Sequence, residues 1–241
     1  MKKTISVFLI LLAISMKANS QINFETDVIE TPKGKLTLHF IGHGTLMLDF
    51  NGTIIHIDPW SKLADYTKLP KADFILVTHH HGDHLDSAAI ASITKKNSQL
   101  IVSKPVFESL KSGIVLNNGD IKTLAGITIE ATPAYNSTPG RDKFHPKGRD
   151  NGYVITMANK RVYIAGDTEN IPEMAALKNI DIAFLPMNQP YTMLPEQVVA
   201  SVEMFNPKIL YPYHYGETDL TKLTELMAKY PKTEVRIRKM E

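Results

Sequence analysis

The sequence predicts an α/β protein in which two mixed β-sheets pack face to face with helices outside both, a four-layer αβ/βα sandwich. Three observations support this prediction. Strand-like segments come in two runs, and helix-like segments follow the strands of each run. A long loop rich in Pro, Gly, Lys and Arg at 133–150 separates the runs. The 241-residue chain is 43% hydrophobic and 22% charged, which suits a globular domain with a sizeable core.

The first run of strands contains a hairpin and a buried strand. The segments 45–50 and 53–57 flank Asn51-Gly52, a dipeptide that strongly favours a two-residue turn. The segment 72–78 contains the apolar run Phe74–Val77, which is typical of a strand buried on both faces. Further strands are expected at 36–40, 99–102, 114–116, 119–124 and 127–131, and helices at 86–95 and 105–111.

The second run repeats the pattern with more helix. A hairpin is predicted from 152–157 and 161–164 through Asn159-Lys160. Strands are then expected at 180–185, 209–211 and 235–237, and helical segments at 171–177, 195–205 and 220–230. In such a sandwich, ligand-binding residues lie at strand ends along one edge.

The N-terminus has the three parts of a secretory signal peptide. Lys2 and Lys3 are followed by an apolar stretch at 5–16 and by Ala18-Asn19-Ser20, a small-x-small cleavage pattern. The apolar stretch is too short to cross about 30 Å of hydrocarbon comfortably. We therefore expect a signal peptide at 1–20, a single domain at 21–241, export to the periplasm or the medium, and no stable membrane anchor after cleavage.

Charge and cysteine content restrict the function. The chain has 27 basic and 25 acidic residues, and removal of 1–20 leaves 24 basic and 25 acidic residues. This balance lacks the basic excess of a nucleic-acid-binding protein. The chain has no cysteine, so metal ligands must come from His, Asp, Glu or weaker donors.

The stretch at 78–86 is unusually rich in metal-binding side chains. It reads Thr-His-His-His-Gly-Asp-His-Leu-Asp directly after Phe74–Val77. Imidazole and carboxylate groups hold divalent metals such as zinc. A solvated polar turn is the alternative, but it would not need so many ligand groups at the end of a buried strand. The sequence therefore predicts a metal site, with two metals.

The spacing His-x-His-x-Asp-His suits two adjacent metals. We expect His79 and His81 to serve one metal, and Asp83 and His84 to serve the other. His80 points away from its neighbours on an extended backbone, so we expect it to lie outside the ligand set.

This motif is the signature of the metallo-β-lactamase-fold hydrolases, and most of residues 21–241 resembles that family. The resemblance implies that Asp167, in Gly-Asp-Thr after an apolar strand, bridges the metals, with a helix N-cap as the alternative role. It also implies that His214 is the last ligand of the second metal, with a surface position as the alternative. Asp58 matches a family position behind the site, where a carboxylate can accept the N–H of a ligating imidazole.

The chain departs from the family at one ligand. The family supplies a third histidine to the first metal from a strand end at which this sequence has Asn136. His145 is the other histidine of the region, and it could be the third ligand, a catalytic residue acting on the substrate, or a surface residue. His43 follows Gly42, as in the subgroup that contains ascorbate-phosphate lactonase and N-acylphosphatidylethanolamine-hydrolysing phospholipase D. We expect His43 either at the rim of the active site or in a structural turn.

The resemblance implies an enzyme with two Zn²⁺ ions per chain, Mn²⁺ being the alternative metal. A metal-bound hydroxide would attack an ester, lactone, amide or phosphoester of a small-molecule substrate. Asp83 would orient this nucleophile and accept a proton, and His145 could donate a hydrogen bond to the reacting oxygen. A β-lactamase is less favoured because the antibiotic-degrading enzymes have no bridging aspartate. A nuclease of the same fold is a competing hypothesis, as is a non-catalytic metal-binding protein, and the oligomeric state is not predicted.

Overall fold

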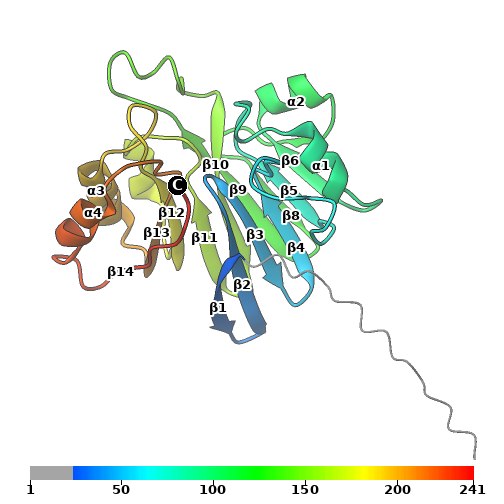
Figure 1. Ribbon diagram of the computed structural model, residues 1–241, viewed down its shortest axis with the longest axis horizontal. Coiled ribbons are helices and arrows are strands. Elements are labelled where there is room, and N and C mark those ends of the chain that lie inside the picture. The colour runs from blue at the N-terminus through cyan, green and yellow to red at the C-terminus, as the bar shows by residue number, and fades with distance from the viewer. Residues whose placement is uncertain (1–23) are drawn as a thin grey trace, which may run out of the picture.

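The computed structural model describes residues 24–241, which contain two seven-stranded β-sheets packed face to face (Figure 1). The predicted signal peptide at 1–20 lies outside the described residues. The strands of the first sheet follow one another in chain order: β1 (Glu25–Thr31), β2 (Gly34–Gly42), β3 (Thr45–Phe50), β4 (Thr53–Ile57), β5 (Phe74–Val77), β6 (Gln99–Val102) and β7 (Ile114–Val115).

The second sheet also follows chain order, from β8 at one edge to β14 at the other. Its strands are β8 (Ile121–Leu124), β9 (Ile127–Ala134), β10 (Asp150–Met157), β11 (Lys160–Ile164), β12 (Ile182–Pro186), β13 (Ile209–Tyr213) and β14 (Glu234–Val235). Both sheets are mixed, because β4 to β7 and β11 to β14 pair in parallel while the other strands pair antiparallel.

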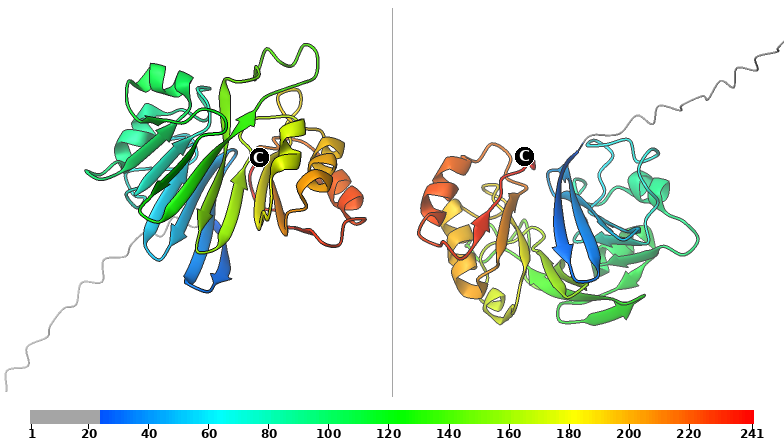
Figure 2. Two further views of the ribbon diagram at one scale, coloured as in Figure 1. Left: turned by 180° about the vertical axis from the view of Figure 1, so that it is seen from behind. Right: turned by 90° about the horizontal axis from the view of Figure 1, so that it is seen from below.

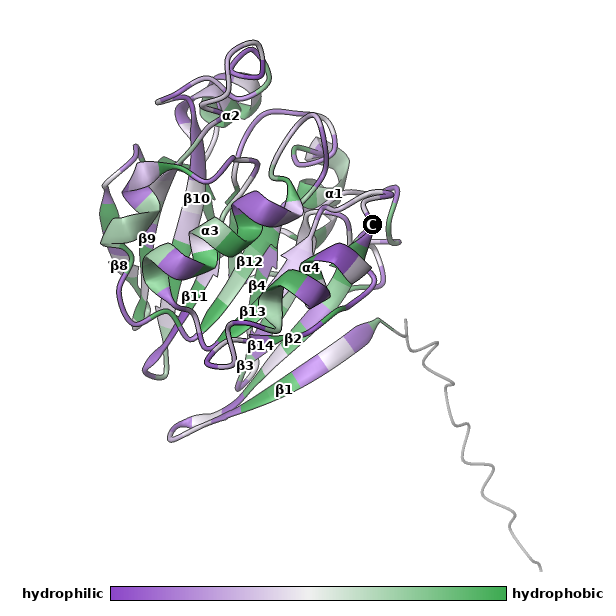
Figure 3. Cartoon of the chain, turned by 90° about the vertical axis from the view of Figure 1, so that its left-hand side faces the viewer, coloured by the Kyte–Doolittle hydropathy of each residue, from purple (hydrophilic) through white to green (hydrophobic). Residues whose placement is uncertain are grey.

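Helices cover the outer faces of both sheets (Figures 1 and 2). The first sheet is flanked by α1 (Ser87–Ile93) and α2 (Lys104–Leu110), and the second by the 3₁₀ helix η1 (Pro172–Ala176), α3 (Pro195–Phe205) and α4 (Leu220–Met227). Figure 3 shows α3 and α4 lying over the second sheet, with polar and apolar residues interspersed along each helix. The predicted four-layer sandwich is confirmed. Within residues 24–241, no helix is long and apolar enough to cross a membrane.

Strand β5 is apolar throughout because its side chains alternate between two buried clusters, one on each face of the sheet. Phe74 and Leu76 belong to the core cluster between the sheets, whereas Ile75 and Val77 belong to the cluster beneath α1 and α2. Successive side chains of a strand point to opposite faces, so a strand buried on both faces has no polar position. The chain after Val77 consequently emerges at the end of a fixed, buried strand.

The predicted boundaries differ from the structure at a few places. Strand β1 was not predicted, because its sequence Glu-Thr-Asp-Val-Ile-Glu-Thr is mostly polar and much of it is exposed. The second hairpin turns at Ala158-Asn159, both with positive φ, and Lys160 already belongs to β11. The helix predicted at 220–230 ends at Met227, and the last strand lies at Glu234–Val235 instead of 235–237.

Candidate metal-binding site

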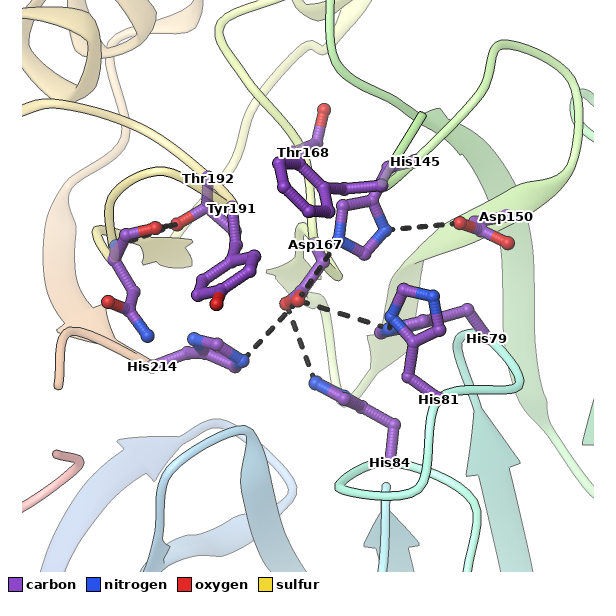
Figure 4. Close-up of polar contacts among 12 residues, drawn as sticks. His79, His81, His84, His145, Asp150, Asp167, Thr168, Tyr191, Thr192 and His214 are labelled. Carbon is purple, nitrogen blue, oxygen red and sulfur yellow. Dashed lines mark hydrogen bonds and ion pairs between the residues drawn. The ribbon is translucent and has the colours of Figure 1, made fainter. Parts of the chain in front are cut away.

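Strand ends of both sheets meet at one edge of the sandwich, and the predicted site residues converge there (Figure 4). Residues His79 to His84 follow β5, whereas Asp167 follows β11 and His214 follows β13. His145 comes from the loop between β9 and β10. Parallel strands present their carboxyl ends on the same side, which is the usual location of ligand sites in open α/β sheets. Residues more than 130 positions apart in the sequence thereby share one site.

Three histidines form the first cluster. His79, His81 and His145 each offer one ring nitrogen, and these atoms lie within 4.8 Å of one another. The Nε2 atom of His79 lies 3.1 Å from Nδ1 of His81. The side chains of His79 and His145 are buried. The cluster therefore presents three imidazoles, the third of which comes from the loop.

The second cluster combines three histidines with a carboxylate: His43, Asp83, His84 and His214. The Oδ2 atom of Asp83 lies 3.7 Å from Nε2 of His214, 3.9 Å from Nε2 of His84 and 3.1 Å from Nε2 of His43. The ring of His43 also packs against His214, with centroids 3.8 Å apart. His43 therefore lies in the turn between β2 and β3 and, at the same time, beside the second cluster.

Asp167 lies between the two clusters. Its carboxylate oxygens are 3.3 Å from Nε2 of His214, 3.6 Å from Nε2 of His84, 3.5 Å from Nε2 of His145 and 3.9 Å from Nε2 of His79. One carboxylate thus faces donors of both clusters, as a bridging ligand would.

The spacing of the donor atoms fits divalent metal binding. A tetrahedral zinc with Zn–N distances near 2.1 Å places its ligand atoms about 3.4 Å apart, and the separations above run from 3.1 to 3.9 Å. Among the described residues, the buried Nε2 atoms of His84, His145 and His214 and Oδ1 of Asp167 have no hydrogen-bond partner. Leaving buried polar atoms unpaired is costly, and cations between them would remove that cost.

A buried carboxylate behind the site holds one histidine of each cluster. Asp58 accepts hydrogen bonds from the backbone N–H of Thr78 at 2.7 Å and from its hydroxyl at 2.6 Å. It also accepts from Nδ1 of His84 at 2.8 Å. The Thr78 hydroxyl in turn lies 2.9 Å from Nδ1 of His79. Such contacts fix the ring orientation and turn the other nitrogen toward the metal.

A second carboxylate supports the third histidine of the first cluster. Asp150 is buried, and its Oδ2 lies 3.2 Å from Nδ1 of His145. The guanidinium of Arg149 binds both oxygens of Asp150, each at 2.8 Å. The role of Asp150 was not predicted, because its only signal in the sequence is an Arg-Asp pair at the end of a long loop.

The amide of Asn136 is engaged with backbone carbonyls of two loops. Its amide nitrogen donates to the carbonyls of Tyr191 at 2.7 Å and Arg141 at 3.3 Å, and its backbone N–H donates to the carbonyl of His145 at 2.8 Å. Between Asn136 and His145 as the third donor, the geometry favours His145. His80 is exposed and absent from both clusters, in agreement with the expected position.

The loop that carries His43 also makes room for His84. A Cβ atom at Gly44 would lie 2.6 Å from Cε1 of His84, closer than van der Waals contact allows. His43 and His214 both have positive φ, 51° and 46°, and the backbone N–H of His214 donates to the carbonyl of His43 at 3.0 Å. Backbone conformations of this kind are costly for residues other than glycine and concentrate at functional sites.

The electrostatics keep most donors in forms that bind metal. Burial lowers the pKa of His81 to about 4, and nearby His145 adds to this effect, so His81 is neutral at pH 7. Burial raises the pKa of Asp83, but the nearby ring of His214 at 3.7 Å and the hydrogen bond from His43 outweigh burial and lower the pKa well below the ordinary value. Burial would lower the pKa of His84, but Asp167 and Asp58 raise it to about 9. Without metal, His84 therefore carries a proton at pH 7.

A cavity of about 330 Å³ opens beside the clusters. It is lined by His43, His81, Asp83, Phe144, His145, Asp167, Asn188, Tyr191 and His214. The volume is at the lower end of the range of small-molecule sites.

The chain matches a protein-family model described as a β-lactamase superfamily domain over residues 37–214. The UPF0173 metal-dependent hydrolase of Caldivirga maquilingensis is 32% identical over 192 residues, which cover 74% of this chain and 82% of the relative. The UPF0173 metal-dependent hydrolase of Thermus thermophilus is 32% identical over 193 residues, which cover 74% and 83%.

Two solved structures extend the comparison. A crystal structure from Parabacteroides distasonis, described as that of a metal-dependent hydrolase, is 52% identical with a TM-score of 0.89 and covers 91% of this chain and 100% of that one. Igni18, a metallo hydrolase from Ignicoccus hospitalis, is 27% identical with a TM-score of 0.72 and covers 85% and 95%.

The fold, the donor clusters and these relatives together define a metal-dependent hydrolase with the metallo-β-lactamase fold. The chain belongs to the β-lactamase superfamily. The membership and the enzyme class expected from the sequence are confirmed, while the resemblance to the lactonase and phospholipase subgroup stays a prediction.

Proposed function

We propose that the protein is a dinuclear hydrolase that uses two zinc ions, with manganese as the alternative metal. His79, His81 and His145 would hold the first ion, Asp83, His84 and His214 the second, and Asp167 would bind both. The observation that carries this proposal is the convergence of buried donor atoms from two sheets, several of them without another partner. His145 thus acts as a ligand in this proposal, in the place of the family histidine absent at Asn136.

The proposed reaction is hydrolysis of an ester, lactone, amide or phosphoester of a small molecule. When bound, the ions supply Lewis acidity, which ionises water near neutral pH and offsets negative charge on the reacting oxygen. Asp83, whose side chain is one-third exposed to the cavity, accepts a hydrogen bond from the attacking water and orients it. Nε2 of His43 donates to Oδ2 of Asp83 at 3.1 Å and so restrains the direction of this carboxylate.

Metal removal and reloading test the proposal. Protein stripped with a chelator should lose hydrolysis of generic esters and phosphodiesters, and Zn²⁺ or Mn²⁺ should restore it with two ions bound per chain by elemental analysis. Asp167→Asn should lower both metal content and activity, because it removes charge between the two clusters. Glu225→Gln, at an exposed carboxylate of α4, is the matched control and should change neither. Full activity of a metal-free preparation would refute the proposal.

We also propose that residues 1–20 direct export. The support is the basic, apolar and small-residue pattern of the sequence. Mass spectrometry of the protein purified from its native cells should find Gln21 at the N-terminus, and an intact Met1 or Lys2 in the accumulated protein would contradict export by cleavage.

A further inference from the structure

Two aromatic side chains form one wall of the cavity beside the donor clusters. Phe144 and Tyr191 pack edge to face, with ring centroids 5.0 Å apart and an interplanar angle of 73°. Tyr191 is 44% exposed, although an aromatic ring of this size usually gains from burial. An exposed aromatic ring at the mouth of an active-site cavity offers a surface on which a ligand can pack.

The backbone beneath each ring is fixed by a separate set of hydrogen bonds. The carbonyl of Tyr191 accepts from the amide of Asn136, and its N–H donates to the carbonyl of Asn188 at 2.9 Å. The carbonyl of Phe144 accepts from Nη2 of Arg149 at 2.6 Å. The two rings come from different loops, and these hydrogen bonds fix the backbone of both loops. The wall is therefore preorganised, which lowers the entropy cost of binding.

Asn136 connects this wall to the first cluster. Asn136 is 2% exposed. Its backbone N–H donates to the carbonyl of His145, and its side-chain amide donates to the carbonyl of Tyr191. The residue that replaces the family histidine thus ties the loop that carries His145 to the loop that carries Tyr191. Asn136 is a positioning residue for the wall.

Each cation of the loop between β9 and β10 is in contact with another side chain. Arg141 pairs with Glu169 at 3.3 Å, Lys147 pairs with Glu173 at 2.8 Å, and Arg149 pairs with Asp150. The ammonium of Lys143 lies 5.0 Å from the centre of the Phe144 ring. Among the described residues, the cavity lining includes no lysine and no arginine. A phosphate dianion would therefore have only the metal ions to pair with, and no lysine or arginine for its remaining oxygens.

We propose that the Phe144–Tyr191 wall recognises an uncharged, planar apolar group of the substrate. The inference rests on the proposed hydrolytic function and narrows it to a carboxylic ester, lactone or amide that carries an aryl or similar group, in preference to a phosphomonoester. Each aromatic contact stabilises the bound substrate, and the two rings together should favour an aryl-bearing ester over a methyl-bearing one by about 10-fold to 100-fold.

The test uses substrates that differ in the presence and the position of one phenyl ring. Ethyl acetate is the small reference, ethyl phenylacetate and benzyl acetate place a phenyl ring on either side of the ester, and phenyl phosphate is the dianion. Rates for the zinc-loaded protein are measured by pH-stat, or by phosphate release for the last substrate. At least one aryl ester should exceed ethyl acetate in kcat/KM by tenfold or more, and phenyl phosphate should be the poorest substrate.

Variants connect the preference to the wall. Tyr191→Ala should lower the ratio of aryl ester to ethyl acetate by about tenfold, whereas Tyr191→Phe should keep it, because the ring makes the contact. Asn136→Ala should lower the ratio with metal content unchanged, since the backbone bond to His145 remains. Phe107→Ala, at an exposed aromatic residue of α2 outside the cavity lining, is the matched control and should keep the ratio.

A binding measurement separates failure of the wall from failure of the hydrolase proposal. Calorimetry compares phenylacetate with acetate on the zinc-loaded protein, and phenylacetate should bind at least tenfold more tightly in the wild type and lose this advantage in Tyr191→Ala. If no substrate is hydrolysed but this difference holds, the proposed reaction fails and the recognition wall stands. If esters are hydrolysed without an aryl preference, or if Tyr191→Ala keeps the preference, the wall is refuted.

Discussion

Replacing Asp58 by asparagine tests whether the two clusters share one support. In the structure this buried carboxylate holds His84 directly and His79 through Thr78. Asparagine has nearly the same shape, but it removes the negative charge and one acceptor. Loss of such a supporting group typically lowers metal affinity about 10-fold to 100-fold, which is roughly 1.4 to 2.8 kcal/mol. We therefore expect both ions to bind more weakly in Asp58→Asn.

Two further variants show which cluster each contact supports. Thr78→Val removes only the hydroxyl that links Asp58 to His79, so we expect weaker binding of the first ion alone. Asp150→Asn replaces the carboxylate beside Nδ1 of His145 by a neutral amide, so we again expect weaker binding of the first ion alone. The assay is competition between the protein and a chelator of known zinc affinity, followed by the visible spectrum of cobalt-substituted protein to distinguish the two sites. The shared-support argument is wrong if Asp58→Asn weakens one ion only, or neither.

The geometry and the charges lead to three more predictions. Gly44→Ala should lower the metal content, because the added Cβ would collide with the ring of His84. Gly82→Ala is the control and should leave the metal content unchanged, because no atom lies within 4 Å of a Cβ at that position. Elemental analysis of both variants checks this. Metal binding at pH 7 should release a proton, because His84 has a pKa of about 9 before the metal arrives. Apparent zinc affinity should therefore rise from pH 7 to pH 9, and calorimetry in buffers of different ionisation enthalpy detects the proton; affinity independent of pH would contradict this. Asp27→Asn should lower the free energy of unfolding by about 1–3 kcal/mol at pH 7, since its carboxylate binds Tyr211, Arg236 and Arg238. These contacts outweigh burial and lower the pKa of Asp27, so their contribution is present above the ordinary pKa and declines as the pH falls through it. Urea unfolding of the metal-free protein at pH 7 and pH 3 should show a smaller difference between wild type and variant at pH 3.

Much of the fold could be predicted because apolar alternation and turn residues act locally. The Asn51-Gly52 turn and the apolar run Phe74–Val77 each indicate their own structure. Strand β1 could not be predicted in this way, because it is mostly polar and exposed although it pairs with β2 along its whole length, and because some of its contacts are distant in the sequence. Asp27 of β1 meets Arg236 and Arg238, more than 200 positions away.

The residues of the candidate site also fall into two groups, those that the local sequence predicts and those that it does not. His79, His81, Asp83 and His84 are neighbours in the sequence, so their spacing alone indicates metal chemistry. Asp167 and His214 were placed by resemblance to a family, because a single Asp or His after a strand has no local signature.

The amino-acid sequence by itself determined the class of chemistry: a dense run of imidazoles and carboxylates after a buried strand, with no thiol to take their place. Only the tertiary structure decided that His145 joins the first cluster while Asn136 ties two loops together. The reason is physical: a loop of this length could direct either side chain inward. The contact of Asn136 with the backbone of Tyr191 exists only once the strands of the second sheet have assembled. The meeting of His145 with His79 and His81 exists only once the two sheets have packed.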